Sequence, residues 1–206
     1  MRKMQRKIEE AYCTSAQFEY AEQGFDRNWG PAAITNLMIA LGAERRLVKP
    51  VDRTGLERGN ADNFYPIRVA DEKVYMAVAM LGERELMYIN ADIFGRFGGT
   101  VPFRVRSYIR ACLRAFRIED AYPLAATRLT EENALEALGR GSLLYLMLHH
   151  HPLYGNNHMV AYGAAERDGR LYLRVADGWH HLPVWLPLEE LDAAMIEVAI
   201  QRETLR

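Results

Sequence analysis

Residues 23–37 read QGFDRNWGPAAITNL, and the centre of this stretch is Trp29, which Gly30 and Pro31 follow directly. Proline is favoured in the first turn of a helix, because the N–H that it lacks would have no partner there. Apolar residues then recur with helical spacing until Gly42, a residue typical of helix ends. The stretch therefore predicts a buried helix that begins close to Trp29.

Outward from this helix, the sequence predicts further helices and then strands. The change of period from helical to alternating falls near residue 140. Asp71 and Thr100 are the expected caps of the second and third helices, and Thr130 that of the fourth. The expected elements are helices at 71–81, 100–116 and 130–139, strands at 142–148, 158–163, 171–175 and 195–200, and a turn at 168–169.

This order predicts one α+β domain over residues 1–206, with a helical lobe at about 20–140 packed on an antiparallel sheet lobe at 141–206. The chain has 206 residues, of which 50% are hydrophobic and 26% charged, which suits one well-buried core or two small lobes.

The charge balance favours neither a nucleic acid nor an anionic membrane as partner. The 26 Lys and Arg residues face 27 Asp and Glu residues, for a net charge of -1. No apolar run approaches the roughly 18 residues that span a bilayer, and residues 1–10 lack the apolar core of a signal peptide. We therefore expect a cytoplasmic protein without membrane insertion, although a secreted form whose signal has been removed stays an alternative.

Cys13 and Cys112 are the two cysteines, and they lie far apart in the sequence. They form neither a CxxC pair nor a disulfide framework. Cys112 falls on the apolar face of the expected third helix and is predicted to be a core residue.

A second group of polar residues lies in the predicted sheet. Residues 157–163 read NHMVAYG and residues 173–179 read LRVADGW. His158 begins one strand and Asp177 follows the next, so we expect the two side chains to face each other and to share a hydrogen bond.

Together, these segments resemble the papain-like cysteine peptidases, most closely the bacterial family that cleaves double-glycine leader peptides. In that family a Gln precedes the catalytic Cys by six positions, as Gln23 precedes Trp29 (29 − 23 = 6), and Gly-Pro follows. The separations from position 29 are 129 for His158 (158 − 29) and 148 for Asp177 (177 − 29), close to the papain pattern of about 130 to 150.

The resemblance covers about residues 20–195 and implies a papain-like fold with four site residues. Gln23 would donate to the oxyanion, and position 29 would carry the nucleophile at a helix N-terminus, where a thiolate is favoured. His158 would be the base and Asp177 would orient its ring, while Trp179 resembles the aromatic residue that shields this pair from water.

The sequence departs from the family at the nucleophile, because Trp29 stands where the family has Cys. An indole has no nucleophilic lone pair, so a covalent acyl-enzyme cannot form at this position. The resemblance then implies a degenerate peptidase-like protein that binds a peptide or a polypeptide, with no cofactor.

The alternative is a hydrolase or a transferase that uses His158 and Asp177 with another nucleophile, Cys13, or with a bound metal. All six histidines lie between His149 and His181 and are of a type that binds zinc. Adjacent strand residues point to opposite faces, however, and no HExxH spacing is present. We therefore expect no metal.

Overall fold

The computed structural model describes residues 29–43, 58–59, 66–67, 69–89, 99–178 and 184–201. Within these ranges it contains four α-helices and a six-stranded antiparallel sheet, so the predicted α+β class is confirmed. The helices are α3 (Trp29–Ala40), α4 (Val69–Arg84), α6 (Val105–Ala115) and α7 (Glu131–Gly139). The strands of the sheet are β5 (Ala121–Arg128), β6 (Leu143–Leu148), β7 (His158–Arg167), β8 (Arg170–Ala176), β9 (Val184–Pro187) and β10 (Ala193–Ile200).

Shorter elements connect these parts. They are the strand pairs β1 (Arg58–Gly59) with β2 (Pro66–Ile67) and β3 (Tyr88–Ile89) with β4 (Gly99–Thr100), and the 3-10 turns η3 (Pro102–Arg104) and η4 (Leu188–Glu190). None of the described helices is long and apolar enough to cross a membrane.

The strand order of the sheet is β5-β10-β6-β7-β8-β9, and each strand is antiparallel to its neighbours. The sheet begins at Ala121, before the predicted boundary near residue 140. Strand β5 was missed because its sequence, AYPLAATR, has a proline and several alanines instead of β-branched residues. The predicted strand at 195–200 is β10, and it lies inside the sheet, between β5 and β6.

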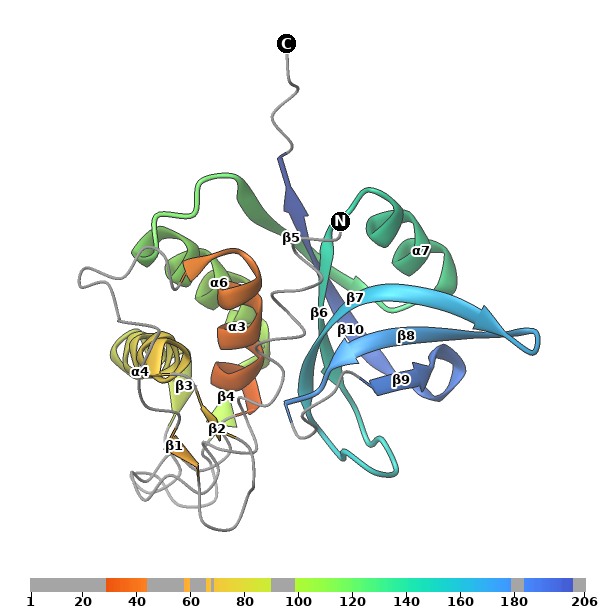
Figure 1. Cartoon of the computed structure of the whole chain (residues 1–206), viewed down its shortest axis with the longest axis horizontal. Coiled ribbons are helices and arrows are strands. Elements are labelled where there is room, and N and C mark those ends of the chain that lie inside the picture. Colours follow the sequence, from red (N-terminus) through yellow and green to blue (C-terminus); the bar gives the residue numbers. More distant parts are fainter. Residues whose placement is uncertain are drawn as a thin grey trace.

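The sheet separates two hydrophobic cores. Helices α3, α4 and α6 lie on one face of the sheet and α7 on the other (Figure 1). We call the core between the sheet and α3, α4 and α6 the helix-side core, and the core on the other face the α7-side core. Every residue of β6 is buried, because alternate side chains enter the two cores. Leu143, Tyr145 and Met147 enter the helix-side core, whereas the other three residues of this strand enter the α7-side core.

Helix α6 confirms the predicted apolar face. Its buried positions follow helical spacing, and Cys112 lies among them with no solvent exposure. Burial raises the pKa of the Cys112 thiol far above its usual value, which makes this thiol unreactive. The buried residues of this face are Val105, Tyr108, Ile109, Cys112, Leu113 and Phe116.

Two of the three predicted helix caps are wrong. Asp71 lies inside α4, which begins at Val69. Thr100 belongs to β4, and α6 begins only after η3, so that Arg104 is its N-terminal flanking residue. Asp and Thr are also common in turns and loops, so their presence alone does not fix where a helix begins. In both cases tertiary packing decides the helix start instead.

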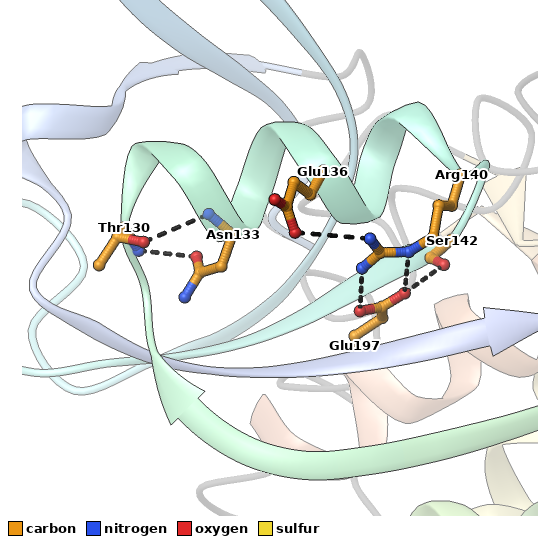
Figure 2. Close-up of polar contacts among 6 residues, drawn as sticks. All are labelled: Thr130, Asn133, Glu136, Arg140, Ser142 and Glu197. Carbon is orange, nitrogen blue, oxygen red and sulfur yellow. Dashed lines mark hydrogen bonds and ion pairs between the residues drawn. The ribbon is translucent and has the colours of Figure 1, made fainter.

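Thr130 is the cap that is confirmed, and Figure 2 shows its capping box with Asn133. The Thr130 hydroxyl accepts from the Asn133 backbone N–H at 3.3 Å, while the Asn133 Oδ1 accepts from the Thr130 N–H at 2.9 Å. Two otherwise unpaired donors of the helix start are thereby satisfied.

The other end of α7 is joined to the sheet by Glu197, in an arrangement that we call the Glu197 clamp (Figure 2). Arg140 donates from Nη2 to Glu197 Oε2 at 2.8 Å and from Nε to Oε1 at 3.3 Å. The Ser142 hydroxyl donates to the same Oε1 at 2.7 Å. Glu197 is 7% exposed, so these bonds balance the cost of burying its carboxylate.

Candidate functional site

Trp29 is the first residue of α3, in agreement with the predicted helix start. The remaining residues of this helix are buried, and α3 packs against β6 and β7. Trp29 itself is partly exposed, but its indole Nε1 is buried and has no hydrogen-bond partner in the described part of the chain. The position of the expected nucleophile therefore holds a desolvated N–H donor.

Gly30 brings the start of α3 close to β4. A Cβ atom placed on Gly30 would lie 1.8 Å from the Oγ1 atom of Thr100. Real Cβ atoms do not approach other atoms so closely, so this contact requires glycine. The glycine of the Gly-Pro pair thus has a packing role beside any role in catalysis.

His158 begins β7 on the side of the sheet that faces α3. Its ring is edge-on to Tyr145, with centroids 5.6 Å apart, and its Nδ1 lies 2.6 Å from the Tyr145 hydroxyl. Tyr145 is fully buried, and burial raises the pKa of its hydroxyl well above the usual value. The hydroxyl therefore stays protonated, and its hydrogen bond occupies the Nδ1 atom of the ring in either tautomer.

Burial also keeps the His158 ring neutral. The pKa of His158 is lowered to about 4, mainly by burial and secondly by the neighbouring His149. A base of this pKa accepts protons weakly at neutral pH, and its Nδ1 is already occupied by Tyr145.

Asp177 lies at the end of β8 and is 3% exposed. Its Oδ2 accepts a hydrogen bond of 2.7 Å from the hydroxyl of Tyr154, a member of the α7-side core. No hydrogen bond of the described residues joins Asp177 to His158, so the predicted pair is wrong.

A bulge in β7 explains this error. Near the hairpin turn, Gly163 of β7 pairs with Arg174 of β8, and the next pair is Ala161 with Val175. Between these two pairs β7 advances by two residues and β8 by one, so Tyr162 is an extra residue of β7. A shift of one residue turns the following side chains to the other face of a sheet. His158 consequently faces the helix-side core with Val160, whereas Asp177 continues the α7-side face of Val175.

The neighbouring histidines diverge. His149 and His150 are exposed at the end of β6, while His151 is buried and accepts at Nδ1 from the backbone N–H groups of Leu153 and Tyr154, at 3.2 and 3.3 Å. The described residues contain no group of three or more side chains suited to hold a metal ion.

Several predicted residues fall outside the described ranges. These are Gln23 and Cys13, together with Trp179, His180 and His181. The predictions for the oxyanion donor, the alternative nucleophile and the shielding aromatic residue therefore stay predictions.

Two tyrosines that were not among the predicted site residues hold His158 and Asp177 in place. Tyr145 and Tyr154 are buried, and a buried tyrosine hydroxyl nearly always has a hydrogen-bond partner. Tyr145 is the single polar side chain in the apolar run 143–148, and this signal pointed to a partner on a neighbouring strand.

A row of direct register partners extends from His158 across the helix-facing side of the sheet. His158 pairs with Met147, Met147 with Ala194, and Ala194 with Arg128. Arg128 and Ala194 also line a hollow of about 300 Å³ together with His149. Arg128, His149 and His158 thus bring polar side chains to this end of the sheet.

Comparison of the chain with models of known protein families found no match, and neither did comparison with curated proteins.

Proposed function

We propose that this chain is a degenerate, papain-like protein that binds a polypeptide and does not cleave it through a covalent intermediate. The observation that carries the proposal is the place of Trp29. It begins a buried helix that packs on the strand headed by His158, as a nucleophile would, but it supplies an N–H donor instead of a thiol.

The state of the two partner residues supports a role without catalysis. His158 has its Nδ1 bonded to Tyr145, and Asp177 is bonded to Tyr154 on the other side of the sheet. A general base needs a nitrogen that is free to take the proton and a second group that orients the ring. The described residues do not provide this arrangement.

Polypeptide is the ligand class that fits both the resemblance and the geometry. A peptide backbone offers carbonyl oxygens, and the Trp29 Nε1 lacks an acceptor within the described residues. An unpaired buried N–H costs free energy, and a bound carbonyl would recover it.

A binding experiment tests the proposal with a fluorescein-labelled synthetic peptide of about 20 residues that ends in Gly-Gly, the hallmark of the family's substrates. We expect binding without cleavage, and no change after treatment with iodoacetamide. Trp29→Phe removes the N–H and should weaken binding about fivefold, the equivalent of one hydrogen bond of about 1 kcal/mol. Trp185→Phe is the matched control and should change the affinity less than twofold.

Two outcomes would contradict the proposal. One is the absence of binding to both this peptide and an Ala-Ala variant of it. The other is cleavage that iodoacetamide abolishes, which would favour the alternative enzyme that uses Cys13.

Trp29→Cys tests whether the remaining site is catalytically arranged. A thiol beside a poised imidazole has a pKa well below the usual value of about 8.5 and alkylates fast at neutral pH. Since His158 is bonded to Tyr145, we expect the thiol to react at the rate of free cysteine, within about threefold. Fast alkylation that slows in the double variant with His158→Ala would show an intact dyad and overturn this expectation. The melting temperature must be measured as well, because removal of the indole leaves a cavity.

A further inference from the structure

Away from the candidate site, α4 and α6 border a cavity that is open to solvent and has an unusual charge. The cavity has a volume of about 510 Å³ and is lined by three arginines, Arg84, Arg104 and Arg114. Among the described residues of the lining Glu85 is the one acidic side chain, so these residues carry a net charge of +2, from three positive charges and one negative. The whole chain has a net charge of -1, and this concentration of positive charge is therefore local.

The three arginines come from three elements: Arg84 ends α4, Arg104 ends η3 directly before α6, and Arg114 lies in the last turn of α6. Ser107, Ala111 and Arg114 follow each other at helical intervals along one face of α6, and Arg104 flanks the start of this helix. Arg104 is held toward α4 by a hydrogen bond of 3.2 Å from Nη1 to the Leu86 carbonyl.

The guanidinium groups keep much of their binding capacity. Arg84 pairs with Glu85 at 3.0 Å, but the two side chains are 71% and 46% exposed, and such pairs are weak. The Arg114 guanidinium has neither a hydrogen bond nor an ion pair with any other residue that the structure describes, and the Arg104 guanidinium uses one of its five N–H donors.

The rest of the lining is small or apolar. Leu81 and Met87 contribute from α4 and the turn after it, Ala111 and Ala115 from α6, and the Ser107 hydroxyl adds a hydrogen-bonding group. The volume lies in the range of small-molecule sites, about 300 to 1,000 Å³.

We propose that this cavity between α4 and α6 binds a small molecule that carries two or more phosphate groups. Arginine binds phosphate oxygens with two parallel N–H bonds, and three arginines around one cavity suit a chain of phosphates better than a single phosphate ion. The apolar lining accommodates an uncharged part of the same ligand. This site is independent of the proposed polypeptide binding at Trp29.

Isothermal titration calorimetry with inorganic tripolyphosphate tests the proposal on the full chain. We expect a single site that Arg114→Ala weakens at least tenfold and Arg84→Ala at least threefold, each with an unchanged melting temperature in the absence of ligand. Arg110→Ala is the matched control, because Arg110 is an exposed arginine of the same helix outside the cavity lining. It should change the affinity less than twofold.

Three results would overturn the proposal. The first is no binding of tripolyphosphate at millimolar concentration. The second is an equal loss of affinity in Arg110→Ala and Arg114→Ala, or tighter binding of a DNA oligonucleotide than of tripolyphosphate, since both indicate a general basic surface. The third is citrate binding as tightly as tripolyphosphate, which would exclude selectivity for phosphate over carboxylate.

Discussion

Helices α7 and α3 are attached to opposite faces of one sheet by different means. Helix α7 fully buries only two alanines, Ala134 and Ala137. Hydrogen bonds attach both of its ends to the sheet: Asn133 Nδ2 donates to the Arg128 carbonyl of β5 at 2.6 Å, and the Glu197 clamp holds the other end (Figure 2). Helix α3 buries eleven of its twelve residues, but several buried polar atoms around it have no partner in the described part of the chain. These atoms belong to Trp29, Asn36 and Thr100.

This contrast distinguishes α7, whose polar contacts are satisfied, from α3, which begins at the candidate site residue Trp29. Most buried polar groups in proteins are hydrogen-bonded, and each unpaired one lowers stability. The large apolar contact of α3 compensates for this loss. The α7 contact is closed by hydrogen bonds, whereas the α3 contact leaves buried polar atoms of Trp29, Asn36 and Thr100 without partners in the described part of the chain.

The largest effect is expected from breaking the clamp. Glu197→Ala removes the partner of Arg140 and Ser142, and we expect the free energy of unfolding to fall by about 2 to 3 kcal/mol in urea denaturation. Glu189→Ala is the control, because the ion pair of Glu189 with Arg170 is exposed. A change below about 0.5 kcal/mol is expected there. Equal losses in the two variants would remove the distinction between clamp and surface pair.

The second effect is a pH dependence that comes from His158. Its pKa is about 4 in the folded chain, below the 6.5 of an unperturbed histidine, so between these values the unfolded chain binds the proton. The stabilisation is therefore complete above pH 6.5 and is lost as the pH falls toward 4. We expect a loss of about 2 kcal/mol over this range, which is below the full value of the shift because the residue keeps some exposure.

His158→Gln isolates this contribution, because carboxylates titrate in the same pH range. The difference between the wild type and the variant, measured by urea denaturation at pH 4, 5, 6 and 7, should decrease toward low pH. A difference that does not depend on pH would mean that His158 is not kept neutral by the fold.

The third effect compares two glycines at the two attachments. Gly30→Ala collides with Thr100 and should lower the stability by about 1 to 2 kcal/mol. Gly139→Ala, in α7, meets open space and should raise it by up to about 1 kcal/mol, since alanine is the better helix former. Thermal denaturation followed by circular dichroism measures both. Stabilisation by Gly30→Ala would contradict the close approach of α3 to β4.

The smallest effect concerns two adjacent residues of α3. Asn36 is 1% exposed and neither polar atom of its amide has a partner within the described ranges, whereas the Thr35 hydroxyl donates to the Pro31 carbonyl at 2.8 Å. Asn36→Leu should raise the stability by about 1 kcal/mol, and Thr35→Val should lower it slightly. If Asn36→Leu is instead destabilising, the amide has a structural role that its missing partners do not suggest.

Much of the fold could be predicted from local sequence. The start of α3 at Trp29 and its end before Gly42, the apolar face of α6, and the Asp168-Gly169 hairpin turn all agree with the structure. Each depends on residues within one or two turns of each other. Strands β5 and β9 were missed, because neither has the alternating pattern that marks a half-buried strand.

The candidate site was predicted less completely. Trp29 lies at the predicted helix start and His158 at the predicted strand start, but Asp177 faces away from His158. Their partners, Tyr145 and Tyr154, could not be named in advance, because the choice between two faces of a sheet depends on the pairing of whole strands.

The sequence by itself thus determined where the main helices and hairpin strands lie and that position 29 cannot act as a nucleophile, because these properties depend on local conformation and on the chemistry of single side chains. Only the tertiary structure decided which residues meet. The extra residue at Tyr162 turns His158 toward α3 and leaves Asp177 on the opposite side of the sheet. A bulge arises from the balance of contacts between two strands and two cores, so no short segment of the chain carries its signature.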